Sequence, residues 1–473
     1  MQLLYGITST IIRHSRLTMK KCEEDEERYL IDSESIAAWE NSINEYLGQN
    51  KQQIVRDIFY CDIPIGRLYM RVRDVDLSYV IRINRQGFVH EGVDDNMLTE
   101  QLRYEASVSR KKNGKENTFA HMGFGKSLDR DFVDKHVEET VAADILGMRA
   151  ASSALFFPAS RAGMLLLYKY FFAEKDTNSF LLDADETGNA AKNQLGLSAP
   201  VYSFLQFLLR FTLDHLPGEK EQELLDFIQK HLIDGKLELS SDESFYIPEG
   251  SEQRIPLYLS SSLINELAPI VKMLSGIYRY DTVYYDEIET CLHPLKQKAM
   301  ARLMIRLVNS GMRMIISTHS DSMAGNMNNL LTFTMGSWGA ELKEKKMRDL
   351  SLEEVDILRT KDVHVYQFTN KDHGTSNVRE LEFRTVNNLG YDFELFNQNL
   401  QNLSDDTIKN NGVGMIEGLR FQNKVANIRR QKELDFFERF LRREFVYSDP
   451  DGKKEVWQFQ VIISQHHVFE WSL

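Results

Sequence analysis

Long apolar runs are absent from this chain of 473 residues. The longest, MLLLYKYFF at 164–172, reaches about half the length that a membrane-spanning helix needs. The first residues, MQLLYGITSTIIRHS, show neither the basic start nor the small-residue cleavage site of a secretory signal. We therefore predict a cytoplasmic protein without a membrane partner.

Cysteine and net positive charge are also scarce. Cys22, Cys61 and Cys291 lie far apart, without the spacing of a disulfide framework or a metal site, so we expect reduced thiols. A net charge of −13 argues against a protein that coats nucleic acid with a broadly basic surface, although a local basic groove is compatible with it. The length is enough for two or three domains.

The most regular part of the sequence predicts a strand, a helix and a second strand. DTVYY (281–285) is a β-prone apolar run. Pro294 suits the first position of a helix, and Gly311 suits its end. MRMIIST (312–318) is the next apolar run. This order within a short stretch is typical of a βαβ unit in a parallel sheet, and it predicts an α/β fold.

Two acids and a histidine directly follow these predicted strands. Asp286 and Glu287 come after the first strand, and His319 comes after the second. Parallel sheets bind ligands at this edge, and adjacent carboxylates there are costly unless a cation neutralises them. Asp286 suits Mg²⁺, Glu287 suits a base that deprotonates water, and His319 suits a contact to a γ-phosphate. An ordinary turn is the alternative explanation of the acid pair alone.

A run of serines precedes a predicted apolar helix in LYLSSSLINELAP (257–269). Ser260, Ser261 and Ser262 could present hydroxyl groups and helix amides to a phosphate. Simple N-capping explains the serines equally well when they are taken alone.

Together these segments resemble the nucleotide-binding domain of ABC-type ATPases. VYYDEIETCLHP (283–294) is similar to their Walker B segment and D-loop, STHSD (317–321) to their H-loop, and LSSSLINELAP (259–269) to their signature. The nearest group is the bacterial AAA/ABC ATPases related to the OLD (overcoming lysogenization defect) and SMC families. Serines replace both signature glycines, and Ile288 stands where these proteins usually have proline.

The resemblance implies an α/β, P-loop NTPase fold of the ABC type that uses ATP and Mg²⁺. It implies that Asp286 holds the magnesium, that Glu287 is the catalytic base and that His319 is the switch histidine. The signature, Ser260 to Ser262, would contact ATP held by the partner subunit, so that a homodimer sandwiches the nucleotide. FFPASRAG (156–163) resembles a further element of these ATPases and would place Arg161 near the nucleotide, unless it is a buried structural arginine.

The glycine-rich phosphate loop of such an ATPase, GxxxxGK(S/T), matches no segment of the chain. AHMGFGKS (120–127) contains Lys126 but lacks the first glycine, and a basic surface loop is the alternative. MQLLYGITSTI (1–11) resembles the helix that normally follows the loop, which would place the loop before Met1. On that interpretation residues 1–473 alone bind ATP weakly and hydrolyse it slowly.

The order of segments predicts four parts. Residues 1–163 would belong to the ATPase domain, 164–250 would form a helical insertion with a hairpin, 251–383 would complete the domain, and 384–473 would be a mixed C-terminal extension. In the first part the patterns predict helices over 33–48 and 130–148. They also predict a hairpin from RLYMRVR (67–73) and SYVIRI (78–83), and an irregular polar stretch over 100–130.

In the C-terminal part, DVHVYQF (362–368) and NVRELEF (377–383) are predicted to continue the sheet. Glu417, Asp449 and Asp451 could imitate the acidic residues of a Toprim nuclease, although SDPDG (448–452) is also typical of a turn.

The favoured hypothesis is an ATP-gated switch in bacterial defence or DNA transactions, with a separate effector nuclease and DNA as candidate partners. This role rests on the resemblance alone. A nucleotide-free scaffold that acts through protein contacts is the second hypothesis, and a metal-dependent nuclease is the third.

Overall fold

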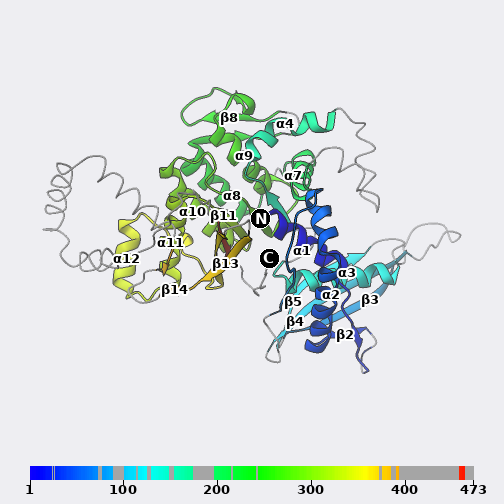
Figure 1. Cartoon of the computed structure of the whole chain (residues 1–473). Helices are drawn as coiled ribbons and strands as arrows, with labels where there is room; N and C mark the ends of the chain where they lie inside the picture. The colour runs from blue at the N-terminus through cyan, green and yellow to red at the C-terminus, as the bar shows by residue number, and fades with distance from the viewer. Residues whose placement is uncertain are drawn as a thin grey trace.

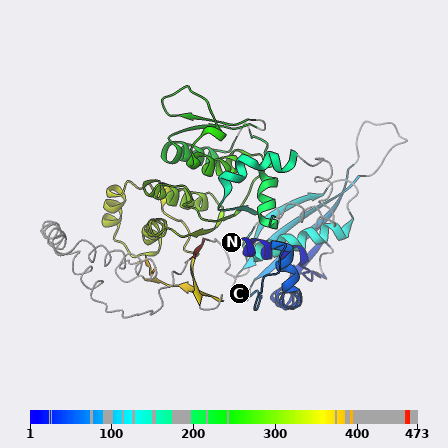
Figure 2. The ribbon, with the colours of Figure 1, turned by 45° about the horizontal axis from the view of Figure 1, so that its top comes forward.

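A computed structural model gives the structure of the chain. It describes residues 1–23, 25, 27–72, 77–88, 101–112, 115–124, 129–148, 154–173, 197–214, 217–240, 243–371, 375–384, 390–393 and 458–463. Two large hydrophobic cores divide these residues into an N-terminal unit, up to residue 148, and an α/β unit from residue 154 onward. Figures 1 and 2 show the two units side by side, the first in blue and cyan and the second mainly in green and yellow.

The N-terminal unit packs three helices against one antiparallel sheet. The helices are α1 (Gln2–His14), α2 (Ser33–Phe59) and α3 (Arg130–Ile145). The strands follow one another in chain order: β1 (Lys20–Lys21), β2 (Arg28–Ile31), β3 (Ser78–Phe88), β4 (Gln101–Lys112) and β5 (Lys115–Phe124). The prediction of α3 is confirmed, and the predicted helix over 33–48 continues to Phe59 because Ile54, Val55 and Ile58 extend its buried stripe.

The predicted hairpin between residues 67–73 and 78–83 is wrong. β3 pairs with β2 and β4, whereas residues 67–71 form no strand. The amide side chain of Asn44 on α2 bonds to both the N–H and the C=O of Met70, and Glu40 accepts from the Val72 N–H. Helix side chains therefore satisfy the backbone groups that a partner strand would otherwise have paired.

The polar stretch over 100–130 is mostly strand rather than irregular chain. β4 and β5 form a long antiparallel hairpin there. Ala106 and Val108 face the core, while Ser107 between them is less buried. Because an antiparallel sheet needs only one apolar face, such strands contain few hydrophobic residues, and this composition concealed them.

The α/β unit is built on a six-stranded sheet in the order β13-β12-β16-β11-β10-β6. Three strands are parallel: β6 (Ala154–Phe157), β10 (Thr282–Tyr285) and β11 (Arg313–Thr318). The other three are antiparallel: β12 (Val363–Lys371), β13 (Thr375–Leu381) and β16 (Gln458–Ile463). The predicted βαβ unit is confirmed, with α10 (Pro294–Asn309) as its crossover helix, and so is the continuation of the sheet by β12 and β13.

The remaining elements of this unit surround the sheet. They are the helices α4 (Arg161–Ala173), α7 (Ala199–Leu209), α8 (Glu219–Ile228), η2 (Gln229–Ile233), η3 (Leu257–Leu259), α9 (Ser262–Ser275), α11 (Asp321–Met335), α12 (Ala340–Asp349) and η4 (Glu354–Asp356), and the strands β7 (Gly235–Glu238), β8 (Phe245–Pro248), β9 (Ile255–Pro256), β14 (Phe383–Arg384) and β15 (Gly390–Tyr391). The predicted hairpin in this region is confirmed as β7 and β8.

Alternating side chains of the parallel strands face opposite sides of the sheet. Val283 and Tyr285 of β10 point into the large core that contains α9 and α10. Tyr284 points to the other side, where it packs with Phe156 and Ile315. Both faces of β10 are therefore buried, as expected for a strand inside a parallel α/β sheet.

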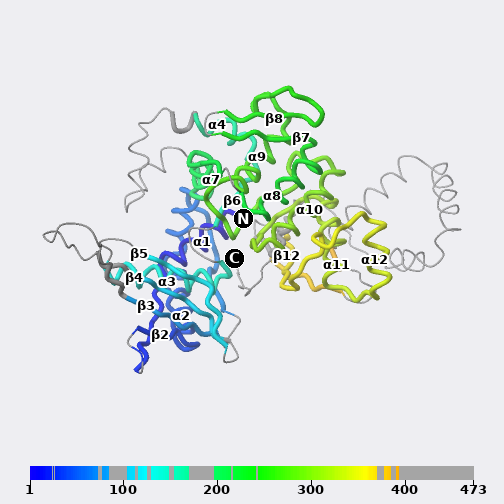
Figure 3. Tube along the Cα trace, turned by 180° about the vertical axis from the view of Figure 1, so that it is seen from behind, coloured from blue at the N-terminus to red at the C-terminus, as the bar shows by residue number. Residues whose placement is uncertain are grey.

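Helix α1 connects the two units. Ile7, Ile11 and Ile12 lie in the core of the N-terminal unit. From the same helix, the Tyr5 ring lies 5.3 Å from that of Tyr284, and the Tyr284 hydroxyl donates to Thr8 Oγ1 over 3.2 Å. Figure 3 shows the N-terminal end of α1 between the two units. Among the helices that the structure describes, none is long and apolar enough to span a membrane.

Candidate active site at the ends of the parallel strands

Asp286, Glu287 and His319 converge at one edge of the parallel strands. β10 ends at Tyr285 and β11 at Thr318, and the two run in the same direction. His319 Nε2 lies 3.4 Å from Glu287 Oε1, with 28% of the histidine side chain and 38% of the glutamate side chain exposed. These residues therefore meet at the edge where their sequence positions predicted them.

Ser317 holds the acid pair in place. Its hydroxyl donates to Asp286 Oδ1 over 2.5 Å and accepts from the Glu287 N–H over 3.0 Å. The residue is almost completely buried, so water does not compete for these bonds. The sequence reasoning missed Ser317, although its position in the strand just before His319 was the available signal.

Glu289 was missed as well. Its Oε1 accepts from the main-chain N–H of His319 over 2.6 Å, and so it ties the end of β11 to the turn after β10. The departure at Ile288 also has an explanation here, because the Ile288 N–H donates to the Ser317 carbonyl over 3.2 Å. A proline at this position could not make that bond.

Glu287 has a left-handed backbone conformation with φ of 48°. This region is uncommon for a residue other than glycine, and surrounding contacts must hold it. The Thr290 hydroxyl donates to the Glu287 carbonyl over 2.9 Å, which closes the turn from one side. The turn directs Glu287 toward His319.

Arg161 lies beneath this turn and is 1% exposed. It is the first residue of α4 and donates to the main-chain carbonyls of Asp286 and Glu287 over 2.8 and 3.1 Å. Its ion-pair partner is Glu266 of α9, at 2.9 Å between Nε and Oε2. These contacts therefore support the alternative, in which Arg161 is a buried structural arginine.

The three serines lie at the start of α9. Ser261 is the N-cap, and its hydroxyl accepts from the Ile264 N–H over 3.4 Å. The Ser260 hydroxyl donates to the Pro256 carbonyl over 3.2 Å. Ser261 and Ser262 are exposed, and within the described residues no hydrogen bond joins any of the three to Asp286, Glu287 or His319.

The amino group at the start of α1 interacts electrostatically with the Asp286 carboxylate. Burial lowers the pKa of the Met1 amino group, and the Asp286 carboxylate opposes that change. A helix N-terminus has a partial positive charge, so α1 presents this charge to the acid at the sheet edge.

Residues 174–324 match the AAA ATPase domain family. This segment includes Asp286, Glu287, His319 and the serine run. It covers about a third of the chain, so the similarity to an AAA ATPase domain is limited to this part. The mixed α/β architecture agrees with a P-loop NTPase-like fold.

No curated protein matches the chain. Among solved structures, an SMC head bound to the C-terminal winged-helix domain of ScpA is 12% identical over 65% of this chain and 75% of its own, with a TM-score of 0.24. The Pyrococcus furiosus SMC head with an extended coiled coil, bound to the C-terminal domain of ScpA, is 10% identical over 80% and 87%, with a TM-score of 0.26.

The donor set at this sheet edge fits magnesium held jointly with a nucleotide. Within the described ranges no group of three metal-ligating side chains gathers. Mg²⁺ in nucleotide sites usually takes one or two protein oxygens and completes its octahedron with phosphates and water. Asp286 offers such an oxygen, and the Ser317 hydroxyl fixes its orientation.

The alternative phosphate loop at 120–127 begins in the other sheet. Ala120 to Phe124 form the end of β5, the edge strand of the antiparallel sheet, rather than a strand beside β10. Gly125, Lys126 and Ser127 lie outside the described residues, as do Glu417, Asp449 and Asp451 of the nuclease alternative.

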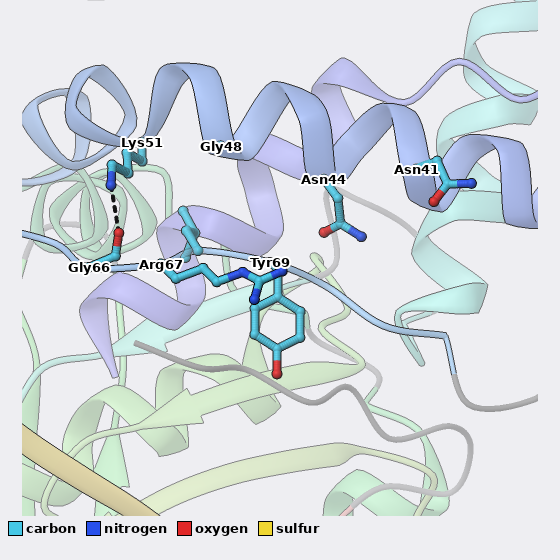
Figure 4. A pocket seen from close by; sticks show the side chains of 8 residues that line it. Asn41, Asn44, Gly48, Lys51, Gly66, Arg67 and Tyr69 are labelled. Carbon is cyan, nitrogen blue, oxygen red and sulfur yellow. Dashed lines mark hydrogen bonds between the residues drawn. The ribbon is translucent and has the colours of Figure 1, made fainter.

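A polar cavity of about 350 Å³ lies on the N-terminal unit, between α2 and residues 66–69 (Figure 4). Lys51 Nζ donates to the Gly66 carbonyl over 2.6 Å across it, and Arg67 stacks on Tyr69 at 5.0 Å. The bond from Lys51 attaches residues 66–69 to α2. The cavity is lined by elements other than those that form the candidate site.

Proposed function

We propose that this protein is an ABC-type switch ATPase, in which Asp286 holds Mg²⁺, Glu287 is the base and His319 contacts the γ-phosphate. The observation that carries the proposal is the 3.4 Å approach of His319 Nε2 to Glu287 Oε1 at the carboxyl edge of β10 and β11. Bound ATP with Mg²⁺ would supply the phosphoryl group and the charge that neutralises Asp286.

Each side chain has a defined task in this proposal. Glu287 is partly exposed, so a water molecule can reach its carboxylate and transfer a proton to it. His319 orients that carboxylate, and the Glu289 bond to its main-chain N–H fixes the position of the histidine backbone. Ser317 orients Asp286 through a neutral hydroxyl, which leaves the negative charge available for a cation.

A homodimer that sandwiches ATP is part of the proposal. Ser261 and Ser262 are exposed at the N-terminus of α9, beside Tyr258 and Leu259, which are 65% and 66% exposed. Exposed apolar side chains next to a helix N-terminus suit contact with a second subunit. The cytoplasmic role in bacterial defence or DNA transactions, the OLD-like relationship and a separate effector nuclease rest on the sequence resemblance alone.

Glu287→Gln tests the assignment of the base. In a protein that carries the phosphate loop, we expect a loss of turnover of about 100-fold or more with ATP binding retained, because the amide keeps the shape of the side chain but not its basicity. Glu341→Gln, at an exposed acid on α12, is the matched control and should leave turnover unchanged. Unchanged turnover in Glu287→Gln would refute the role of Glu287.

A second experiment concerns the phosphate loop. We expect calorimetry with ATP and Mg²⁺ to show weak binding to residues 1–473 and tighter binding after fusion of a strand and GxxxxGK(S/T) before Met1. Micromolar binding by residues 1–473 would instead favour Lys126, and Lys126→Ala should then abolish it. Absence of binding by both proteins would favour the nucleotide-free scaffold.

A further inference from the structure

Arg161 contacts the candidate site from the segment that joins β6 to α4. It follows β6, which pairs in parallel with β10, and it begins α4. One terminal nitrogen donates to the carbonyls of Pro158 and Asp286 over 3.0 and 2.8 Å, and the other donates to the Glu287 carbonyl over 3.1 Å. The guanidinium also lies over the Tyr285 ring at 4.4 Å.

These contacts determine the backbone of the acid pair rather than its carboxylates. A guanidinium is planar and presents its donors in a fixed fork, so it can fix two successive carbonyls relative to each other. The second of these carbonyls belongs to Glu287, the residue with the left-handed φ of 48°. The fork therefore favours the turn that directs Glu287 toward His319.

The charge of Arg161 is balanced by a different element. Glu266 lies one turn into α9, the helix that begins at Ser262, and is 3% exposed. Its Oε2 is 2.9 Å from Arg161 Nε, and its Oε1 accepts from the Ala162 N–H over 3.3 Å. Burial raises the pKa of Glu266, while Arg161 opposes that rise. The carboxylate thus connects α9 to the start of α4.

We propose that Arg161 and Glu266 couple the position of α9 to the backbone of Asp286 and Glu287, with Arg161 as a positioning residue. A displacement of α9, for example when a ligand or partner meets the serines at its N-terminus, moves Glu266 and with it the guanidinium. The fork then alters the turn at Glu287. The effect on turnover rests on the proposed ATPase function, whereas the coupling itself does not.

A second buried arginine cluster offers a matched control. Arg302 and Arg306 of α10 pair with Asp356, which is 0% exposed, at 2.7 Å each. Like Arg161, these arginines are largely buried in the α/β unit, but they form ion pairs with Asp356 of η4 and with Glu353 just before it, and their guanidinium groups lie over the Phe227 ring of α8. Replacing Arg302 perturbs a buried ion pair without touching Asp286 or Glu287.

Hydrogen–deuterium exchange on the full chain tests the coupling without requiring activity. In Arg161→Met and Glu266→Gln, we expect amides of residues 286–290 to exchange about tenfold faster or more, because the turn loses its restraint. Arg161→Lys should retain the positive charge opposite Glu266 and most of the stability of the protein. Its amides at residues 286–290 should nevertheless exchange as fast as those of Arg161→Met, because lysine lacks the planar fork of donors. Arg302→Met should lower global stability without this local change.

Three results would overturn the proposal: unchanged local exchange in Glu266→Gln, full protection in Arg161→Lys, or equal local loss in Arg302→Met. If Arg161→Met does not fold, the other two site variants still decide. Where the wild type hydrolyses ATP, Arg161→Lys should lower kcat about tenfold or more with little change in KM. If the protein with a phosphate loop fused before Met1 does not hydrolyse ATP, the proposed function fails, while the exchange results on residues 1–473 still test the coupling.

Discussion

Asp144 and Asp286 show how differently the two units treat a carboxylate. Asp144 of α3 is 7% exposed and accepts from the Tyr79 hydroxyl over 2.6 Å and from two nitrogens of Arg110. Asp286 is only half-buried, and its carboxylate accepts from the neutral Ser317 hydroxyl. Within the described residues no lysine or arginine side chain forms an ion pair with Asp286.

The difference separates a structural acid from one that is available for a ligand. The charge of Asp144 is neutralised inside the fold, so the residue contributes to stability and has little affinity left for a cation. The charge of Asp286 is oriented but not neutralised, which is unfavourable for the empty fold and favourable for binding magnesium. Four substitutions test this comparison.

The largest effect should follow Asp144→Ala. Removing this carboxylate leaves Arg110 and Tyr79 without their buried partner, and we expect a loss of about 3–5 kcal/mol in the free energy of unfolding. Urea denaturation measures it. Asp134→Ala, which breaks the more exposed pair with Arg130, should cost less than about 1 kcal/mol. Similar losses in both variants would contradict the structural role of Asp144.

Glu138 of α3 is an acid in the N-terminal unit whose charge is poorly compensated. Burial raises its pKa from 4.5 to about 7, with Arg16 opposing the shift. An acid with a raised pKa in the folded state favours folding below its ordinary pKa, and this contribution is lost as the pH rises through the folded value. Glu138→Gln should therefore be more stable than wild type at pH 8 by about 1–2 kcal/mol, after allowance for solvent screening.

Denaturation of both proteins at pH 4 and pH 8 measures the effect of Glu138. We expect the stability difference to shrink at the lower pH, where the wild-type carboxyl is protonated. A difference that is independent of pH would show that packing, rather than ionisation, is responsible.

Tyr284→Phe should have a smaller effect on the connection between the units. The change removes the hydroxyl that donates to Thr8 Oγ1 while keeping the ring that packs against Tyr5. We expect a loss of about 1 kcal/mol, the usual contribution of one buried hydrogen bond. Tyr258→Phe, at a ring that is largely exposed, is the control and should leave the thermal midpoint unchanged.

Asp286→Asn should have the smallest effect on the free fold. The amide oxygen can still accept from Ser317, so we expect a change in stability below about 0.5 kcal/mol. The variant should nevertheless lose any magnesium-dependent stabilisation by ATP in thermal unfolding. A loss of 2 kcal/mol or more without ligand would make Asp286 a structural acid like Asp144.

The sequence predicted the βαβ unit because its signals are local. An apolar run, a proline at the helix start and a second apolar run define β10, α10 and β11, and the order of parallel strands places Asp286 and His319 at one edge. The hairpin at 67–83 was predicted wrongly because Asn44 and Glu40, from a distant helix, take the place of a partner strand.

The contacts that support the site join residues that lie far apart in the sequence. Glu266 meets Arg161 only when α9 packs on α4, and no spacing in the sequence indicates this. β16 enters the sheet between β11 and β12 from residues 458–463, far along the chain from both neighbours. Local periodicity contains no information about such partners.

The left-handed conformation of Glu287 has a consequence for the choice of residue at that position. Glycine adopts this φ without steric cost, whereas glutamate is strained by roughly 1 kcal/mol or more. The side chain is also more than a third exposed, so it adds little packing in return. At position 287 the chain therefore gives up stability for the sake of a carboxylate, a trade-off between robustness and chemistry at a single residue.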